Sequence, residues 1–272
     1  VTGVQTCALP ILFKGVFLMP KEFETKRVLV TGAASGIGQA QAIAFAEQGA
    51  EVIGIDLDET GLKQTAALVN PDSTKPFTYF VGDVSSPSFV QATMKQIVKN
   101  NGQIDILLNT AGILDDYRPS LETSEALWDQ ILATNLKSVF LVTNALLPYF
   151  LQQKKGVIVN MASIAGLVAG GGGAAYTASK HAIIGYTKQL SYDYAKLGIR
   201  ANAIAPGAIQ TPMNAADFAG EGEMATWVAR ETPAGRWAQP QEVAKLSLFL
   251  ASDDADYIHG TVMTIDGGWT MK

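Results

Sequence analysis

Residues Arg27–Gly38 read RVLVTGAASGIG and combine a short apolar run with a cluster of glycines. The run Arg27–Thr31 is rich in β-branched residues, as is typical of a buried strand, and a helical pattern over residues 39–48 follows the glycines. A glycine-rich turn between a strand and a helix exposes backbone N–H groups, and the helix dipole favours an anion there. We therefore expect a dinucleotide site rather than a purely structural turn. The expected contacts come from Gly32, Ser35, Gly36, Ile37 and Gly38.

The alternation of strand and helix patterns continues along the rest of the chain. Further strands are expected at residues 51–56, 77–81, 104–108, 156–161, 199–205 and 262–265. Helical patterns cover residues 59–69, 87–100, 121–153, 174–196 and 242–250. Such alternation forms a doubly wound parallel sheet with helices on both faces. With no internal repeat or second domain boundary in view, we expect one α/β domain over residues 19–272.

Composition excludes several classes of protein. The chain has 272 residues, a formal net charge of −5 and 48% hydrophobic residues, which is enough for a large core. A net negative charge argues against nucleic acid as the main partner. Cys7 is the only cysteine, so no intramolecular disulfide can form and a cysteine-based metal site is not expected. This cysteine usage is consistent with the cytoplasm.

The first 18 residues, VTGVQTCALPILFKGVFL, do not fit this pattern. Pro10 and Lys14 interrupt any signal-peptide h-region, and the apolar run is too short to span a bilayer, so no membrane association is expected. Codons for residues 1–11 can spell a common sequencing-library adapter, and codons for residues 14–16 can spell a ribosome-binding site. We therefore expect the natural chain to begin at Met19, the alternative being a genuine N-terminal extension.

Asp56 ends the second expected strand, about twenty residues after the glycine turn. At that place a carboxylate accepts hydrogen bonds from an adenosine ribose and repels a 2′-phosphate. The glycine turn contains no Arg or Lys, and none directly follows Asp56. These observations favour NAD over NADP. The alternative is that Asp56 caps the next helix, although Asp58 is equally suited to that role.

Polar and small residues follow the third and fourth expected strands. Asp83 and Val84 can contact an adenine ring, or Asp83 can cap a helix. The small residues Ala111 and Gly112 would let the backbone pass close to a cofactor, while Asn109 can bridge neighbouring strand ends. Asn135 is a further candidate, because it interrupts an apolar helical pattern and a buried amide needs partners, whether for structure or in a site.

Three further residues are candidates for proton transfer to or from a substrate: Tyr176, Lys180 and Ser163. Tyr176 and Lys180 are four residues apart, so a helix places both side chains on one face with Cβ atoms about 5–6 Å apart. A neighbouring ammonium lowers the pKa of a phenol and makes it an acid–base group near neutrality. Ser163 ends the fifth expected strand, at the edge where open α/β sheets bind ligands.

These motifs together resemble the short-chain dehydrogenase/reductase family over nearly all of residues 23–272. The resemblance is carried by TGxxxGIG, Asp83-Val84, NxAG at residues 109–112, Asn135, Ser163, YxxxK at residues 176–180, Pro206-Gly207 and Thr211. Thr110 departs from the family, which usually has asparagine there, and little effect on the chemistry is expected. The family likeness implies a seven-stranded Rossmann sheet of order 3-2-1-4-5-6-7, a nicotinamide cofactor and a homotetramer.

The resemblance also implies roles for individual residues. The catalytic group would be Ser163, Tyr176, Lys180 and Asn135, with Tyr176 and Lys180 also touching the cofactor. Cofactor contacts are expected from Gly32, Ser35, Gly36, Ile37, Gly38, Asp56, Asp83, Val84, Asn109, Ala111, Gly112, Pro206, Gly207, Ile209 and Thr211. His181 is expected on the surface, and no metal is expected.

Residues 212–237 are expected to cover the substrate as a lid, because they mix apolar side chains with glycines; the alternative is packing under another subunit. Tyr117 and Arg118 are candidate pocket walls. The predicted function is an NAD-preferring oxidoreductase of short-chain type acting on a small alcohol or ketone. One alternative is a 3-oxoacyl-[acyl-carrier-protein] reductase, against which Asp56 counts. Another is a non-catalytic dinucleotide-sensing scaffold, against which the intact catalytic group counts.

Overall fold

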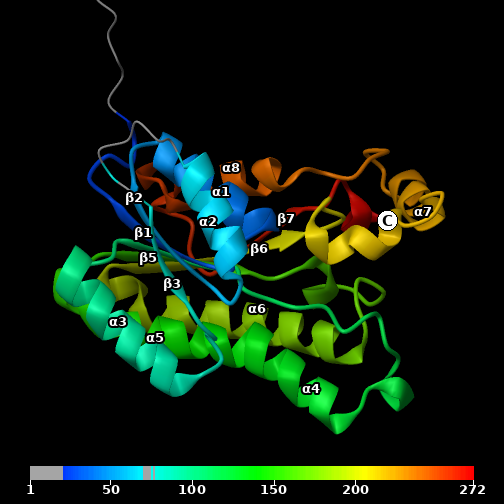
Figure 1. Ribbon diagram of the computed structural model, residues 1–272, viewed down its shortest axis with the longest axis horizontal. Helices are drawn as coiled ribbons and strands as arrows, with labels where there is room; N and C mark the ends of the chain where they lie inside the picture. The colour runs from blue at the N-terminus through cyan, green and yellow to red at the C-terminus, as the bar shows by residue number, and fades with distance from the viewer. Residues whose placement is uncertain (1–20, 70–74, 76) are drawn as a thin grey trace, which may run out of the picture.

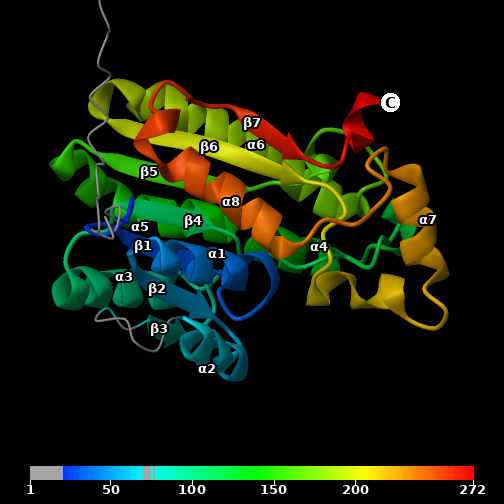
Figure 2. The ribbon, with the colours of Figure 1, turned by 90° about the horizontal axis from the view of Figure 1, so that it is seen from above.

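A computed structural model describes residues 21–69, 75 and 77–272; the expectations for residues 1–18 lie outside them. Seven parallel strands form one sheet in the order β3-β2-β1-β4-β5-β6-β7, which confirms the expected topology (Figure 2). The strands are β1 Arg27–Thr31, β2 Glu51–Asp56, β3 Thr78–Val81, β4 Ile106–Asn109, β5 Gly156–Met161, β6 Ile199–Pro206 and β7 Val262–Ile265.

Helices cover both faces of this sheet (Figure 1). They are α1 Gly36–Glu47, α2 Glu59–Leu68, α3 Pro87–Asn101, α4 Glu125–Leu132, α5 Ser138–Gln153, α6 Ala174–Tyr194, α7 Glu223–Glu231 and α8 Pro240–Ala251. Successive residues of a strand point to opposite faces. In β1, Val28 and Val30 pack in a core with α1 and α8, whereas Leu29 packs in a second core with α3 and α5.

The expected single helix over residues 121–153 is divided into several pieces. A 3₁₀ turn, η1 (Ser120–Glu122), precedes α4, and a π-helical turn, η2 (Ala133–Lys137), separates α4 from α5. π-turns are rare and often lie at functional sites. The buried side chain of Asn135 lies in this turn. The apolar periodicity identified the helical segment correctly. It gave no sign of the π-helical turn, which holds one more residue than an α-helical turn.

The helical segment Glu125–Gln153 is also the one candidate membrane span among the described residues, by length and composition. Of its most apolar window, 44% is buried inside the protein. Val142, Leu146 and Phe150 lie in the core beneath the sheet. A core helix of a folded domain passes the same test, so the segment is weak support for a membrane span.

The carboxyl ends of the strands lead into the segments that surround the site. After β6 the chain forms a 3₁₀ segment, η5 (Pro212–Phe218), and then α7. The final turn, η7 (Trp269–Met271), follows β7 and lies beside α7 in both views (Figures 1 and 2). There Trp227 of α7 and Trp269 meet edge to face, with ring centroids 6.4 Å apart.

Candidate active site

Two glycines of the turn after β1, Gly32 and Gly38, are packed against neighbouring backbone with no space for a side chain. A Cβ on Gly32, whose φ is +73°, would lie 2.9 Å from the Ala111 backbone, and one on Gly38 would lie 2.0 Å from the Gly32 carbonyl oxygen. At the N-cap of α1, the Ser35 side chain forms no capping hydrogen bond. The first N–H groups of a helix lack intrahelical partners. They are therefore available to an anionic ligand at this turn.

Asp56 accepts a hydrogen bond from the backbone of the glycine turn. Its carboxylate accepts hydrogen bonds from the Ala34 N–H and the Asp58 N–H, both at 3.0 Å. The cap of α2 is Asp58, which accepts from the Thr60 N–H at 2.9 Å. The capping alternative considered for Asp56 therefore applies to Asp58. Asp56 remains at the end of β2 and lines the cavity described next.

A cavity of about 650 Å³ extends from the glycine turn, past the carboxyl ends of β4, β5 and β6, to the segment after β6. Ligand sites usually have volumes of this order. Most of the predicted site residues line it: Gly32, Ser35, Gly36, Ile37, Gly38, Asp56, Ala111, Gly112, Ser163, Tyr176, Lys180, Pro206, Gly207, Ile209 and Thr211. The sequence therefore identified residues from six separate stretches that the fold brings together.

Four predicted site residues are not among those that line the cavity: Asp83, Val84, Asn109 and Asn135. Asp83 is exposed, and its carboxylate accepts the Ser85 N–H at 2.7 Å; the cap of α3 is Ser86. Val84 packs in the core of the α3 face. The short strand β3 ends before these residues, so a place after a strand did not by itself bring them to the cavity.

Asn109 belongs to a buried polar network between strands. Its side-chain amide donates to Asn160 Oδ1 at 2.9 Å and to Thr143 Oγ1 at 3.1 Å, and Asn160 in turn donates to Thr187 of α6 at 2.9 Å. The bridging role considered for Asn109 is confirmed, and the residue holds β4, β5, α5 and α6 in place. Among the described residues Asn109 Oδ1 has no hydrogen-bond partner.

Asn135 links the π-turn to the segment that follows β4. Its Oδ1 accepts from the Ile113 N–H at 2.8 Å, and its Nδ2 donates to the Ile113 carbonyl at 2.9 Å and to Ser179 Oγ at 3.3 Å. A Cβ on Gly112 would lie 3.3 Å from Asn135 Oδ1 and 3.6 Å from Lys180 Nζ. The amide thus lies behind Gly112, close to the Lys180 ammonium.

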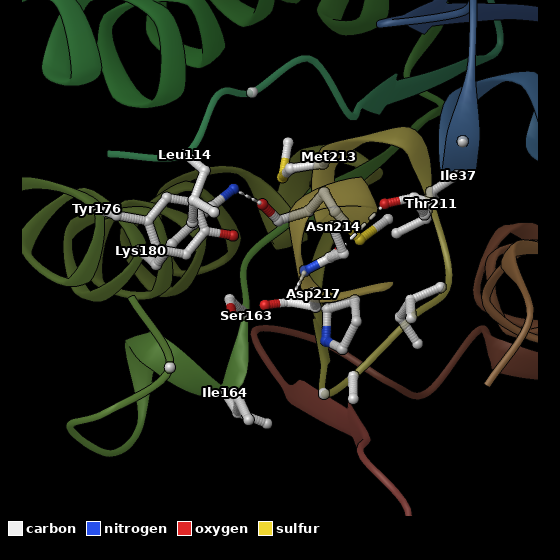
Figure 3. Close-up of a pocket in the computed structure, with 18 of the residues that line it drawn as sticks. Ile37, Leu114, Ser163, Ile164, Tyr176, Lys180, Thr211, Met213, Asn214 and Asp217 are labelled. Atoms are coloured by element: carbon white, nitrogen blue, oxygen red, sulfur yellow. Dashed lines mark hydrogen bonds between the residues drawn. The ribbon is translucent and has the colours of Figure 1, made fainter. Parts of the chain in front are cut away.

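Ser163, Tyr176 and Lys180 meet in the cavity (Figure 3). Lys180 Nζ donates to the Met161 carbonyl at 2.8 Å and lies 5.4 Å from the centre of the Tyr176 ring. The Ser163 hydroxyl lies at the end of β5, where it accepts from the Ala165 N–H at 3.1 Å. All three side chains are buried, so substrate would meet them in a site shielded from bulk water.

Burial is the largest influence on the pKa values of Tyr176 and Lys180. It raises the pKa of the Tyr176 phenol to about 12, against the opposing effect of the hydrogen bond with Ser163. Burial lowers the pKa of Lys180 to about 8. The expectation that Lys180 brings the phenol pKa towards neutrality is therefore not met, because desolvation of the phenolate is the largest effect and raises that pKa. The Tyr176 phenol keeps its proton near neutral pH and can donate it.

One buried carboxylate that the sequence analysis missed positions the N-terminus of α6, the helix that carries Tyr176 and Lys180. Asp115 accepts from the Gly173 N–H at 2.8 Å and from the Tyr176 N–H at 2.9 Å, at the N-terminus of α6. A carboxylate there satisfies orphan N–H groups and complements the helix dipole. Because 58 residues separate Asp115 from Gly173, no local pattern reveals this cap.

Asp115 also begins a turn with unusual backbone angles. The next two residues, Asp116 and Tyr117, have φ of 54° and 57°, and the Arg118 N–H donates to the Asp115 carbonyl at 3.2 Å. Left-handed angles at two successive residues other than glycine are costly and cluster at functional sites. The turn directs Tyr117 to the cavity, as expected, whereas Arg118 is not among the lining residues.

The segment after β6 forms the opposite wall. Its lining residues are Thr211 at the N-cap of η5, Pro212, Met213, Asn214 and Asp217 of η5, and Met224, Trp227 and Val228 of α7, together with Trp237 and Trp269. Of these, the sequence analysis did not single out Asn214 and Asp217, two polar residues in an otherwise apolar stretch. His181 is exposed, as expected.

Thr110, the departure from the family pattern, lies in a polar chain across the helix layer. Its hydroxyl donates to Gln41 Oε1 at 2.6 Å, and Gln41 Nε2 donates to Ser247 Oγ at 2.8 Å. Gln41 and Ser247 are fully buried. The threonine therefore connects the cavity wall to α1 and α8.

Comparisons with known proteins agree with this geometry. A family model described as Enoyl-(Acyl carrier protein) reductase matches residues 32–270. The chain is 40% identical over 254 residues to the 3-oxoacyl-[acyl-carrier-protein] reductase FabG of Thermotoga maritima, covering 90% of this chain and 98% of that one. The crystal structure of levodione reductase superposes with a TM-score of 0.87 at 35% identity, covering 92% and 99% of the two chains.

A second solved structure bears on the cofactor. A putative NAD(P)-dependent gluconate 5-dehydrogenase from Beutenbergia cavernae, with bound NADP, has a TM-score of 0.86 at 34% identity, covering 93% of this chain and 100% of that one. The fold, the site and these matches define the class of protein. The chain belongs to the short-chain dehydrogenase/reductase family and is an oxidoreductase. This family uses a nicotinamide dinucleotide as cofactor.

Proposed function

We propose that the protein transfers hydride between a nicotinamide dinucleotide, preferably NAD, and a small alcohol or ketone, with Tyr176 as the acid–base residue. One observation carries the proposal. Ser163, Tyr176 and Lys180 line the same cavity as the glycine turn and Asp56. A dinucleotide bound to that turn extends along the cavity towards Tyr176, so one site serves both binding and proton transfer.

The residues present fit this cofactor. Gly32 and Gly38 of the turn after β1 have no room for a side chain, and the uncapped N-terminus of α1 lines the cavity, which suits a pyrophosphate. Asp56 would accept the adenosine ribose hydroxyls, and Lys180 would hold the second ribose. Ile209 and Thr211, which line the cavity beyond Pro206 and Gly207, would hold the carboxamide. When bound, the cofactor accepts or supplies the hydride.

The chain's own residues handle the proton. During reduction, Tyr176 donates its proton to the substrate oxygen, and during oxidation it removes a proton from the hydroxyl. Ser163 hydrogen-bonds the same oxygen and orients it. Lys180 favours the phenolate once charge develops on Tyr176, since it lies 5.4 Å from the ring. Asn135, behind Gly112, would support a water that continues the proton path from Lys180.

The preference for NAD rests on Asp56. A carboxylate at the end of β2 that is already fixed by the Ala34 N–H cannot turn away from a 2′-phosphate without losing that bond. The NADP in the Beutenbergia structure belongs to that protein and shows that this fold also accepts the phosphorylated cofactor. Parallel assays with NAD(H) and NADP(H) measure the preference directly.

A second candidate is a 3-oxoacyl-[acyl-carrier-protein] reductase, which the relative from Thermotoga favours. Asp56 counts against it, because reductive biosynthesis generally uses NADPH. A dinucleotide-sensing scaffold would bind the cofactor without turnover. We also propose a cytoplasmic homotetramer, by family likeness. Half-exposed apolar side chains on α4 and α5, Trp128 and Phe140, support packing against other subunits.

The test combines a substrate panel with one substitution. Wild-type protein is assayed with neutral alcohols and ketones and both cofactors, together with Tyr176→Phe and the control Tyr192→Phe, on the exposed part of the same helix. Loss of general acid–base catalysis should lower turnover of Tyr176→Phe by at least about a hundredfold. NADH binding, followed by fluorescence, should persist in all three proteins. Unchanged turnover by Tyr176→Phe would disprove the mechanism, and no turnover by wild type would favour the scaffold.

A further inference from the structure

Three charged side chains line the cavity among the described residues: Asp56, Lys180 and Asp217. Asp56 lies at the glycine turn, where it holds Ala34. Lys180 donates to the Met161 carbonyl behind Tyr176. Asp217 alone projects from η5, on the wall that faces Ser163 and Tyr176 (Figure 3). The wall formed by η5 and α7 therefore carries a negative charge and no arginine or lysine that lines the cavity, and Lys180, the one cation among the described lining residues, lies behind Tyr176.

The cations around this wall are engaged elsewhere. Arg236 forms two hydrogen bonds of 2.8 Å with the Glu242 carboxylate. Arg230 lies 3.6 Å from Glu231, and Lys272 pairs with the same carboxylate at 3.6 Å while its ammonium lies 4.5 Å from the centre of the Trp269 ring. None of these cations lines the cavity, so none neutralises Asp217 there.

The Asp217 carboxylate keeps free acceptor positions. Its Oδ2 accepts a long hydrogen bond of 3.4 Å from Asn214 Nδ2, and Asn214 Oδ1 accepts from the Thr211 hydroxyl at 3.1 Å. A carboxylate offers about four lone-pair sites, so several remain for a ligand. The charge of Asp217 also reaches the Tyr117 hydroxyl across the cavity, where it helps burial to raise the pKa of that phenol.

Apolar side chains line the cavity together with this carboxylate. They include Leu114, Ile164, Met213, Met224, Trp227 and Val228. Charge interactions are stronger next to low-dielectric walls than in open water. A substrate that carries a carboxylate or phosphate would therefore meet Asp217 without a compensating cation, whereas a donor group would gain a charge-assisted hydrogen bond.

We propose that Asp217 determines substrate specificity: the site takes ketones and alcohols that have an apolar body, no negative charge, and a hydrogen-bond donor distant from the reacting carbon. This inference rests on the proposed function and names its substrate class. Asp217 acts on the distal end of the substrate and takes no part in proton transfer, so its removal changes selectivity rather than the chemical step.

Three ketones of nearly one shape test the idea: 4-acetylbenzoate, 4-acetylbenzamide and 4-(aminomethyl)acetophenone, which are anionic, neutral and cationic. We expect wild-type kcat/KM to be at least about tenfold higher for the amide and the amine than for the benzoate. Asp217→Asn preserves shape and removes the charge, so the ratio of amide to benzoate should fall to within about threefold. Glu221→Gln removes a nearby exposed charge that does not line the cavity, and should keep the wild-type ratio.

Each outcome bears on one claim. A benzoate reduced as well as the amide by wild type, or a ratio that Asp217→Asn leaves unchanged, overturns the role of Asp217. The role of Asp217 is also overturned if the enzyme reduces other ketones but neither the amide nor the amine. If wild type reduces no ketone and oxidises no alcohol in the wider panel, the proposed function itself fails. NADH binding measured on Asp217→Asn confirms that the variant is folded.

Discussion

The two walls of the cavity are built in different ways. On the cofactor side, glycines touch neighbouring backbone: a Cβ on Gly38 would lie 2.0 Å from the Gly32 carbonyl oxygen. On the side of residues 212–237, the segment expected to act as a lid, Gly220 and Gly222 have no heavy atom within 4 Å of the same position, although their φ values are +62° and +67°. At Gly32 and Gly38 the cofactor wall tolerates no added atom. The segment expected to act as a lid presents side chains to the cavity, and its Gly220 and Gly222 have open space around them.

The largest effect is expected from adding a methyl group to the cofactor wall. Gly38→Ala places a Cβ against a backbone oxygen that cannot rotate away, so α1 must move from β1. Overpacking of this kind costs about 3 kcal/mol or more of folding free energy. Thermal unfolding should show a much lower midpoint, with loss of NADH binding.

Gly185→Ala is the matched control. Gly185 lies on an exposed position of α6, and a Cβ there meets no heavy atom within 4 Å. Alanine should stabilise this helix by about 0.5–1 kcal/mol. A Gly38→Ala protein as stable as wild type would show that the cofactor wall is less rigid than its contacts indicate.

The second prediction concerns the pH dependence of the reaction rates, which should follow the buried residues Tyr176 and Lys180 and not Asp217. With its pKa raised to about 12, Tyr176 keeps its proton near neutrality, so ketone reduction should vary little between about pH 6 and about pH 8. Alcohol oxidation needs the unprotonated form, whose fraction rises about tenfold per pH unit below the pKa. The rise should weaken above pH 8, because Lys180, with its pKa lowered to about 8, loses its ammonium there.

Initial rates in both directions, measured against pH, check this. Asp217→Asn should shift substrate selectivity and leave the shape of both profiles in place, since Asp217 takes no part in the proton transfer. Oxidation that does not vary with pH would contradict the role of Tyr176 as base.

The smallest effect is expected in the lid. Gly220→Ala forces alanine into a left-handed conformation, with a cost of about 1–2 kcal/mol, but creates no clash. Unfolding should therefore occur at a slightly lower temperature, while NADH affinity stays within about twofold of wild type, a change of less than 0.5 kcal/mol. A loss of cofactor binding as large as in Gly38→Ala would remove the distinction between the two walls.

The sequence allowed the cofactor wall to be predicted more completely than the lid. The glycine turn, Asp56 and the strands are local patterns, in which neighbouring residues determine the structure. The roles of Asp115 and Asp217 depend on segments that meet only after folding. The cofactor contact predicted for Asp83 stays a prediction, because its carboxylate accepts the Ser85 N–H and the residue is not among those that line the cavity. The pKa of Tyr176 could not be predicted from spacing, since burial decides it.

The last residue of the chain has a practical consequence. Lys272 donates to the Glu231 carbonyl at 2.6 Å, and its ammonium lies over Trp269, a residue of the cavity wall. A purification tag or reporter fused after Lys272 would emerge beside α7, a helix that lines the cavity. Kinetic constants from such a fusion would include the effect of the added polypeptide. Proteins for assay are therefore better made with a cleavable tag placed elsewhere.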